Sequence, residues 1–380
     1  MEAPAEISLC DWIGCNMDVA QNISDRSTAQ PALTCLIPTH NRPQFLRRML
    51  QFYSQFPPGF SFLVVDSGNA ESAAEHLAIV ESWKTRLDVE YRFIDVNFVD
   101  KCARGLELVR TPYVVLCAHD DLLFPDAVWK CVEFLKNEPT YSSAIGRTAE
   151  MHPHRPHWTC RVLKAYPIEE DCPFERCRRI AANWFNNFYA VYRTANLLDM
   201  IQITAGCTDY AFDYSMHEYM LPHLNALRGR VKVLPLMYQL QTRHGANASA
   251  GKKVGNRPQA EFQYQRFREC LATQFVHAGI RHETAVQFID NSYGFFRAPT
   301  WETRVLPRST AAVMRRCLHF LHGLVEKGAA LWRPGFDRHR RFIRTSDLVG
   351  CEPIWNAAVK LIQEYPHGVP STESPLIRIA

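Results

Sequence analysis

No stretch of the 380-residue sequence reaches the roughly 18 consecutive apolar residues that a membrane-spanning helix needs. The first apolar residues are interrupted by Asp11, Asn16 and Asp18, so we expect no secretory leader there. Neither sign of charge dominates, because 43 basic residues balance 39 acidic ones and leave a formal charge of +4. We therefore expect a cytoplasmic protein with no transmembrane segment and no nucleic-acid partner.

Two common phosphate-binding motifs are also absent. There is no G-x-G-x-x-G after the first expected strand and no G-x-x-x-x-G-K-[S/T] anywhere. These absences argue against a dinucleotide-binding Rossmann domain and against a P-loop. A bound phosphate would instead need a metal ion together with lysine or arginine side chains.

Thirteen cysteines are present, but they do not form the closely spaced framework of a small disulfide-rich protein. They are scattered through apolar segments instead. We expect free, mostly buried thiols, as in a reducing compartment.

Apolar segments of strand length alternate with segments of helical spacing in the first third of the chain. The expected strands are residues 33–38, 62–65, 89–94 and 113–118, with helices between them. This alternation predicts an α/β fold with a mainly parallel twisted sheet flanked by helices. Ligands bind beyond the carboxyl ends of the strands in such sheets.

Each expected strand ends in polar residues, and acidic residues end three of the four. The fourth ends at the adjacent carboxylates Asp120 and Asp121, whose charges are costly to bury without compensation. Mg²⁺ or Mn²⁺ carrying a phosphate would neutralise them, since both ions prefer oxygen ligands. The alternative is that Asp121 only begins the next helix as its N-cap.

Four segments occur in a known order: LIPTHNRP at 36–43, VVDSG at 64–68, KCARGL at 101–106 and HDD at 119–121. Together they resemble the motifs of bacterial family 2 glycosyltransferases. The resemblance implies a GT-A fold and the inverting transfer of a hexosyl or deoxyhexosyl group from a nucleotide-sugar, assisted by Mg²⁺ or Mn²⁺. One residue departs from the family pattern, because Ala118 replaces the first acid of the DxD motif.

For the donor site, the resemblance implies a nucleoside diphosphate, and UDP-sugars and dTDP-sugars are both compatible. The segment RHGAN at 243–247 is similar to one that follows the catalytic base in many bacterial members. The implied metal ligands are Asp120, Asp121 and His244. The residues expected to bind the nucleotide-sugar are Pro38, Thr39, Arg42, Asp66, Lys101, His119, Asp120 and Arg243.

A second segment, residues 212–219, resembles the family's Glu-Asp motif, whose second acid is the catalytic base. Counting back from Gly229, which ends the following helix, places Glu218 at that position. An acceptor hydroxyl needs such a carboxylate, because it is a poor nucleophile until its proton is removed. Asp213 is the rival candidate, and a helix residue favoured by the helix dipole is the alternative explanation for Glu218.

The expected acceptor residues are Trp184, Asn186 and His217. Aromatic rings beside amides suit a sugar, although an ordinary half-buried strand explains the same pattern. The acceptor would be a hydroxyl group of a glycan, a lipid-linked glycan or a protein. Arginines between positions 338 and 344 suit peripheral contact with the inner face of a membrane, and a solvated face is the commoner explanation.

The chain is expected to divide into three parts. Residues 1–31 form an N-terminal arm, residues 32–258 a GT-A catalytic domain, and residues 259–380 a helical C-terminal region. Residues 32–125 would bind the nucleotide, and residues 126–258 would carry the acceptor site and the base. The C-terminal region would pack on the catalytic domain, complete the acceptor site or form a homodimer.

Two other functions fit parts of the sequence. The replacement by Ala118 fits a nucleotide- or glycan-binding protein that has lost catalysis. A nucleotidyltransferase shares the α/β sheet and metal chemistry, but it normally needs a glycine-rich basic loop after the first strand. Residues 39–43 lack those glycines.

Overall fold

The computed structural model describes residues 32–154, 157–163, 165–183, 185–207, 215–244, 257–297, 343 and 345–369. The expected N-terminal arm, residues 1–31, lies outside the described residues. The proposed division of the chain into three parts stays a prediction.

The first half of the sheet is parallel, as the sequence predicts. β1 (Leu33–Thr39) pairs with β2 (Ser61–Asp66) on one side and with β4 (Tyr113–Leu116) on the other. β3 (Val89–Phe93) pairs with β2 and forms the edge. β1 and β4 are buried along their whole length, because apolar residues dominate both of their faces.

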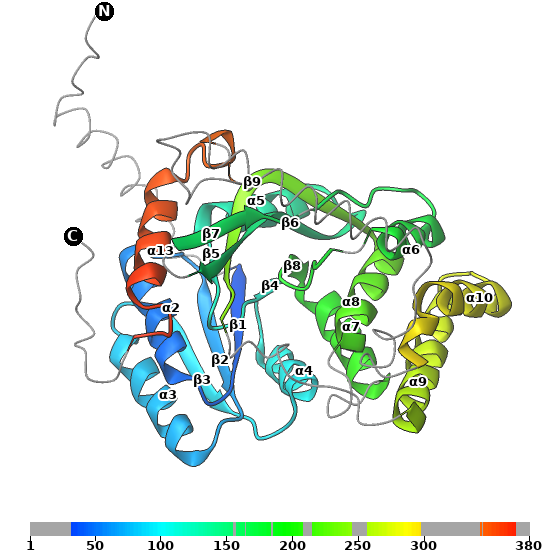
Figure 1. The fold of residues 1–380 in the computed structure, drawn as a ribbon, viewed down its shortest axis with the longest axis horizontal. Helices are drawn as coiled ribbons and strands as arrows, with labels where there is room; N and C mark the ends of the chain where they lie inside the picture. Colours follow the sequence, from blue (N-terminus) through cyan, green and yellow to red (C-terminus); the bar gives the residue numbers. More distant parts are fainter. Residues whose placement is uncertain are drawn as a thin grey trace, which may run out of the picture.

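Three helices connect these strands and flank the sheet: α2 (Pro43–Gln55), α3 (Ala70–Trp83) and α4 (Phe98–Leu108) (Figure 1). Each begins just after a strand ends. The side chains of Asn69 and Asn97 cap α3 and α4 by accepting hydrogen bonds from backbone amides of the first turn. These caps fix where the polar loops at the carboxyl edge of the sheet end and where the two helices begin.

The second half of the sheet is mixed. The strands are β5 (Leu122–Leu123), β6 (Tyr141–His154), β7 (His157–Val162), β8 (Val191–Arg193) and β9 (Arg230–Thr242). β8 joins the two halves by pairing antiparallel with both β4 and β6, and β9 lies parallel to β6. The strand order is β3-β2-β1-β4-β8-β6-β9-β5, with β7 beside β6.

Four further helices belong to this half: α5 (Pro125–Asn137), α6 (Pro173–Ala182), α7 (Thr194–Cys207) and α8 (Ser215–Arg228). Gly229 links α8 to β9, as the sequence predicts. A Cβ atom there would lie 2.8 Å from the backbone nitrogen of Ser142, so the close approach of β6 requires glycine.

The described part of the C-terminal region is helical, with α9 (Arg257–His277), α10 (His282–Tyr293) and α13 (Glu352–Glu364). The short 3-10 helices η2 (Gly294–Arg297) and η4 (Thr345–Asp347) accompany them. α9 contacts α7, α8 and α10, whereas α13 returns to the other side of the molecule and contacts α2 (Figure 1). None of the described helices has both the length and the apolar character needed to cross a membrane.

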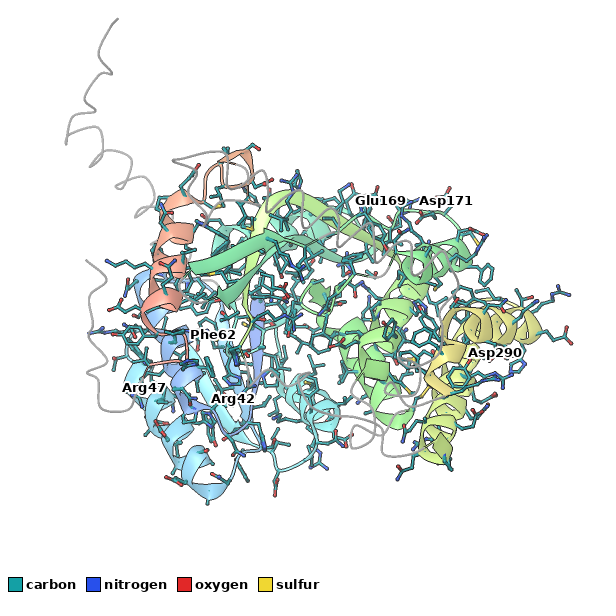
Figure 2. The ribbon with its side chains drawn as sticks, viewed as in Figure 1. Arg42, Arg47, Phe62, Glu169, Asp171 and Asp290 are labelled. Atoms are coloured by element: carbon teal, nitrogen blue, oxygen red, sulfur yellow. A yellow bond between two sulfur atoms is a disulfide. The ribbon has the colours of Figure 1, made fainter. Side chains whose placement is uncertain are left out.

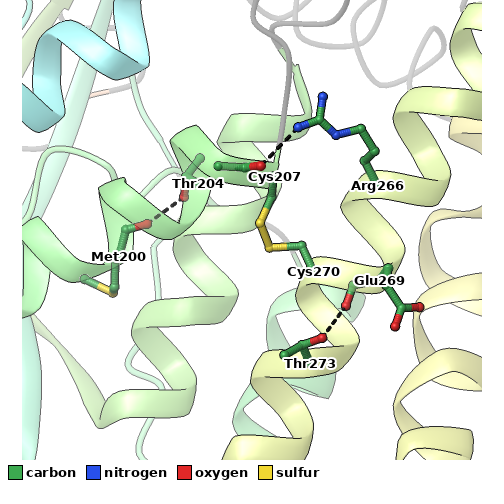
Figure 3. The surroundings of a disulfide bond; sticks show 8 residues. Met200, Thr204, Cys207, Arg266, Glu269, Cys270 and Thr273 are labelled. Atoms are coloured by element: carbon green, nitrogen blue, oxygen red, sulfur yellow. Dashed lines mark hydrogen bonds between the residues drawn. A yellow bond between two sulfur atoms is a disulfide. The ribbon is translucent and has the colours of Figure 1, made fainter.

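A disulfide joins Cys207, the last residue of α7, to Cys270 of α9 (Figure 3). The prediction that the cysteines are free is therefore wrong for this pair. It failed because residues 63 positions apart meet only through the packing of α7 on α9. Six of the eight free cysteines in the described ranges are buried, in agreement with the rest of the prediction.

Replacing Cys270 by serine should lower the free energy of unfolding by about 2–4 kcal/mol, because the 63-residue separation makes loop closure costly without the bond. Urea unfolding of both proteins, with and without dithiothreitol, measures this difference. The exposed, free Cys172 provides the control, since Cys172→Ser should change little. Equal stability of the native chain and Cys270→Ser under oxidising conditions would show that the bond contributes nothing.

Stability should fall as the pH drops from about 6.5, because the buried His223 resists protonation. Its Nε2 lies 2.8 Å from the hydroxyl oxygen of Tyr293, and burial lowers its pKa to about 3. The unfolded chain, with a histidine pKa of about 6.5, therefore binds more protons between these values. The contribution reaches about 1.4 kcal/mol per pH unit. Urea unfolding of native and His223→Gln proteins between pH 7.5 and 5 tests it, since the variant should have a shallower dependence.

Candidate active site at the carboxyl edge of the sheet

The loops that follow β1 and β2 interlock. Asn41 adopts a left-handed backbone conformation with φ 51°, and its Oδ1 accepts a hydrogen bond of 2.7 Å from the amide of Asn69. Gly68 lies against it, since a Cβ atom there would be 2.9 Å from the same Oδ1. His40 Nδ1 lies 2.8 Å from the carbonyl oxygen of Ser67. Hydrogen bonds therefore join the two loops into one rim beside the ends of the parallel strands.

Asp66 lies at the end of β2 and is fully buried. Its Oδ1 accepts from the Gly68 amide at 2.8 Å, and its Oδ2 lies 2.9 Å from both His76 Nδ1 and the Tyr91 hydroxyl. Burial opposes ionisation, but these hydrogen bonds lower the pKa of Asp66. His76 Nε2 also reaches the Thr39 hydroxyl at 3.2 Å. Direct binding of the nucleotide-sugar by Asp66, through its nucleobase or its ribose, stays a prediction, and the contacts favour a supporting role.

Lys101 lies on α4 and is almost fully buried. Its Nζ donates to the Thr39 carbonyl oxygen at 2.6 Å and to Ser67 Oγ at 2.9 Å. Burial lowers its pKa. The lysine thus joins the ends of β1 and β2 across the rim. Its expected approach to the nucleotide stays a prediction, as does that of Pro38, which is buried within β1 opposite Val65.

Three predicted residues from distant parts of the chain meet at Asp120. Its Oδ2 lies 2.9 Å from His244 Nε2 and 3.5 Å from Arg42 Nη1. Burial alone would raise its pKa, but the hydrogen bond from His244 and the charge of Arg42 hold the pKa of Asp120 well below its usual value. Arg42 lies beside the first strands, far across the molecule from Asp290 of α10 (Figure 2). The structure therefore places an ionised carboxylate between a cation and an imidazole.

Asp121 has different surroundings from its neighbour. Its Oδ1 accepts from the backbone amide of Thr242 at 3.0 Å, and its Oδ2 accepts from Gln239 Nε2 at 3.3 Å. Burial and the adjacent Asp120 carboxylate raise the pKa of Asp121. The Asp121 side chain therefore connects the turn after β4 to β9. Its surroundings favour the neutral form of its carboxyl group. Of the expected metal ligands, Asp120 and His244 lie together, and Asp121 accepts hydrogen bonds from β9. The expected role of Asp121 as a metal ligand stays a prediction.

Phe45 forms the floor beneath this group. His244 stacks on its ring with a centroid distance of 4.6 Å, and His119 meets its edge at 6.0 Å. Neither ring nitrogen of the buried His119 has a hydrogen-bond partner in the described ranges of the chain. Burial lowers the pKa of His119 to about 3, so the imidazole is neutral and retains unused hydrogen-bonding capacity.

The side chains of Asp120 and His244 offer ligand atoms that suit a divalent ion. The Asp120 carboxylate oxygen lies 2.9 Å from the His244 imidazole nitrogen. Mn²⁺ binds both types of ligand, and Mg²⁺ binds carboxylates. Among the described residues, no cluster of three or more such side chains is present. An ion held here would therefore take its remaining ligands from phosphate and water oxygens, as Mg²⁺ commonly does.

Arg243, just after the end of β9, is bonded to β6. Its Nε donates to the buried Glu150 at 2.5 Å, and Arg161 holds the other Glu150 oxygen at 2.7 Å. Burial lowers the pKa of Arg243, but the hydrogen bond to Glu150, the charge of Glu150 and that of Glu218 outweigh this effect and raise the pKa. Glu218, in the first turn of α8, therefore contributes to the electrostatic environment of Arg243.

The expected acceptor residues are only partly described. Asn186 uses its side-chain oxygen to accept from the Phe188 amide at 2.9 Å, and Phe188 packs on Phe98 of α4 with ring centroids 6.1 Å apart. Trp184 and the rival base Asp213 lie outside the described residues, as does the side chain of His217. Their expected roles stay predictions.

Three residues that support the site were missed from the sequence. His76 of α3 and Arg48 of α2 lie on the buried faces of their helices, and Glu150 lies within β6. A signal for the first two existed, because a polar residue at an i+3 or i+4 position of an apolar helix face needs a partner. Glu150 carried no such signal, since its arginines come from β7 and from the end of β9.

Comparison with known proteins agrees with this architecture. The model of a family described as glycosyl transferase family 2 matches residues 34–188. S. aureus TarS 1–349 in complex with UDP-GlcNAc is similar in structure, with a TM-score of 0.51 and 15% identity over 68% of this chain and 70% of that chain. A likeness at this identity concerns the fold.

Two further TarS structures give lower scores. A second structure of TarS 1–349 has a TM-score of 0.48 and 16% identity over 67% of this chain and 68% of that chain. A longer S. aureus TarS chain has a TM-score of 0.46 and 16% identity, and the match covers 68% of this chain but only 42% of that one. No curated protein matches the sequence.

Proposed function

We propose that the chain transfers a sugar from a nucleoside diphosphate sugar to a hydroxyl acceptor, with inversion of the anomeric configuration. The premise is that residues 34–188 belong to glycosyl transferase family 2 and carry its GT-A fold. The observation that carries the proposal is the meeting of Arg42, Asp120 and His244 at the carboxyl edge of the sheet. Ligands of α/β sheets bind at such an edge.

The donor end of the proposed site consists of charged side chains. Asp120 and His244 would hold Mg²⁺ or Mn²⁺, and Arg42 would contact a diphosphate oxygen. A bound ion would stabilise the negative charge that develops on the departing nucleoside diphosphate. A UDP-sugar or a dTDP-sugar fits this chemistry, and the structurally similar TarS was crystallised with UDP-GlcNAc.

Glu218 is the proposed base. Its carboxylate would take the proton of the acceptor hydroxyl while the hydroxyl oxygen attacks the anomeric carbon from the face opposite the diphosphate. The bond between that carbon and the diphosphate oxygen breaks, and the nucleoside diphosphate leaves with its electron pair. The electrostatic effect of Glu218 on Arg243 supports this role, because Arg243 and His244 both follow the end of β9.

The acceptor class and the setting of the enzyme belong to the same proposal. We propose a glycan, lipid-linked glycan or protein hydroxyl as the acceptor, and a cytoplasmic enzyme that works alone, as a homodimer or at the inner face of a membrane. The arginines between 338 and 344, which motivate the membrane contact, lie outside the described residues.

Incubation with UDP-sugars and dTDP-sugars, Mn²⁺ and a set of hydroxyl acceptors tests the function. The proposal expects release of nucleoside diphosphate and a product whose anomeric configuration, read by NMR, is opposite to that of the donor. The alternative of a binding protein without catalysis, which Ala118 motivates, expects binding but no release. A nucleotidyltransferase would instead release pyrophosphate from a nucleoside triphosphate and a sugar phosphate.

A further inference from the structure

Residues 365–369, which we call the clasp, follow α13 and lie against the start of α2. The amide of Val369 donates to the Gln44 carbonyl oxygen at 3.0 Å. Gly368 has φ +86°, and a Cβ atom there would lie 2.6 Å from the Gln44 carbonyl carbon and 2.7 Å from its oxygen. Only glycine therefore fits at this point of the clasp.

Arg48 connects the clasp to the donor edge. Its side chain is fully buried, and its Nη1 donates to the Tyr365 carbonyl oxygen at 3.0 Å. Its Nη2 donates to the Asp120 carbonyl oxygen at 2.6 Å and lies 3.4 Å from Thr242 Oγ1. One guanidinium group thus joins three segments that are distant in sequence: the clasp, the turn after β4 and the end of β9.

The chemistry of this contact requires arginine. A planar guanidinium presents five donors in a fixed fork, whereas a lysine ammonium is a compact group on a flexible stem. The guanidinium also lies 5.1 Å from the centre of the Phe45 ring, on which His244 stacks. Arg48 is therefore packed against the aromatic floor of the donor edge as well as bonded to its backbone.

We propose that Arg48 is a positioning residue and that the clasp, acting through Arg48, holds the Asp120 turn and the end of β9 in the geometry that binds the donor. The inference rests on the proposed function, because these two elements carry Asp120 and His244. It implies that residues far beyond the family 2 segment at 34–188 complete the donor site.

Gly368→Ala tests the clasp by disturbing its contact with Gln44, without replacing any residue of the donor edge. Gly350→Ala is the matched control, because Gly350 also has a positive φ, of 78°, but its Cβ would meet nothing within 4 Å. The readout is hydrogen exchange of the Asp121 and Thr242 amides, which donate to the Ala118 carbonyl and to Asp121 Oδ1. We expect exchange to become roughly tenfold faster in Gly368→Ala and to stay unchanged in Gly350→Ala.

A double-mutant cycle with Arg48→Lys separates positioning from general loss of stability. If the clasp acts through Arg48, the double variant with Gly368→Ala should exchange no faster than Arg48→Lys alone. The dissociation constant for UDP with Mn²⁺ should rise about tenfold in both single variants. The proposal would be overturned if the amides exchanged equally fast in Gly368→Ala and Gly350→Ala. It would also be overturned if the rate increases of the two single variants multiplied in the double variant, or if the UDP affinity of the single variants were unchanged.

The exchange measurement needs no ligand, so it is independent of the proposed function. If the native chain binds neither UDP nor dTDP with Mn²⁺, the proposed donor is wrong, and the exchange rates alone decide whether the clasp holds the turn. If the native chain binds one of them, that nucleotide serves as the affinity probe.

Discussion

Replacing Glu218 by glutamine should lower the rate of sugar transfer by about 10²–10⁴-fold, the usual contribution of a general base. Glutamine keeps the size and the hydrogen-bonding oxygen of the side chain but cannot accept the proton of the acceptor hydroxyl. The affinity for nucleoside diphosphate and Mn²⁺ should stay unchanged, because Glu218 takes no part in donor binding in this account. Steady-state kinetics and calorimetric titration measure the two effects separately.

A matched glutamate controls for the position of Glu218 in its helix. Glu175 also lies in the first turn of a helix, α6, where it pairs with the exposed Arg178. Glu175→Gln should keep the native rate. Asp213→Asn tests the rival base. Native activity in Glu218→Gln would remove Glu218 from the mechanism, and a large loss confined to Asp213→Asn would move the role there.

Replacing Asp120 by asparagine should weaken the binding of nucleoside diphosphate with Mn²⁺ on the order of a hundredfold, because the proposed ion would lose its charged protein ligand, one half of a buried charge pair. The carboxylate compensates Arg42 and accepts from His244, and asparagine supplies no negative charge to either. Without Mn²⁺ the variant and the native chain should differ much less, because the lost group is the proposed ligand. Calorimetric titration with and without the ion measures both values.

The neighbouring carboxyl group gives a demanding control. Asp121→Asn is the same chemical change one residue along, but burial and Asp120 favour the neutral form of Asp121. An asparagine oxygen can still accept from the Thr242 amide. Asp121→Asn should therefore retain donor affinity within about threefold, in the range of one weak hydrogen bond. Equal losses in both variants would contradict the separate roles given to the two residues.

The parallel half of the sheet could be predicted because its signals are local. β1 and β4 are continuous apolar segments, and parallel pairing places Thr39, Asp66 and Asp120 near one edge whatever the rest of the chain does. The family resemblance added His244, and the structure places it against Asp120. These predictions needed only the spacing of apolar residues along the sequence and the order of its motifs.

The mixed half of the sheet depends on contacts that the sequence does not encode locally. β9 pairs with β6 and with the two-residue strand β5, so its length is set by partners more than 75 residues away. The Cys207–Cys270 bond has the same origin. Burial of Asp66 was also unexpected, because its histidine and tyrosine partners come from α3 and β3 and no motif marks them.

The most direct test of the account is anomalous diffraction from Mn²⁺ in crystals of the chain grown with UDP or dTDP. The account predicts a manganese peak beside the Asp120 carboxylate and the His244 imidazole, with the diphosphate next to Arg42. A nucleotide bound away from the carboxyl edge of β1, β2 and β4, or a manganese peak that neither Asp120 nor His244 contacts, would contradict it.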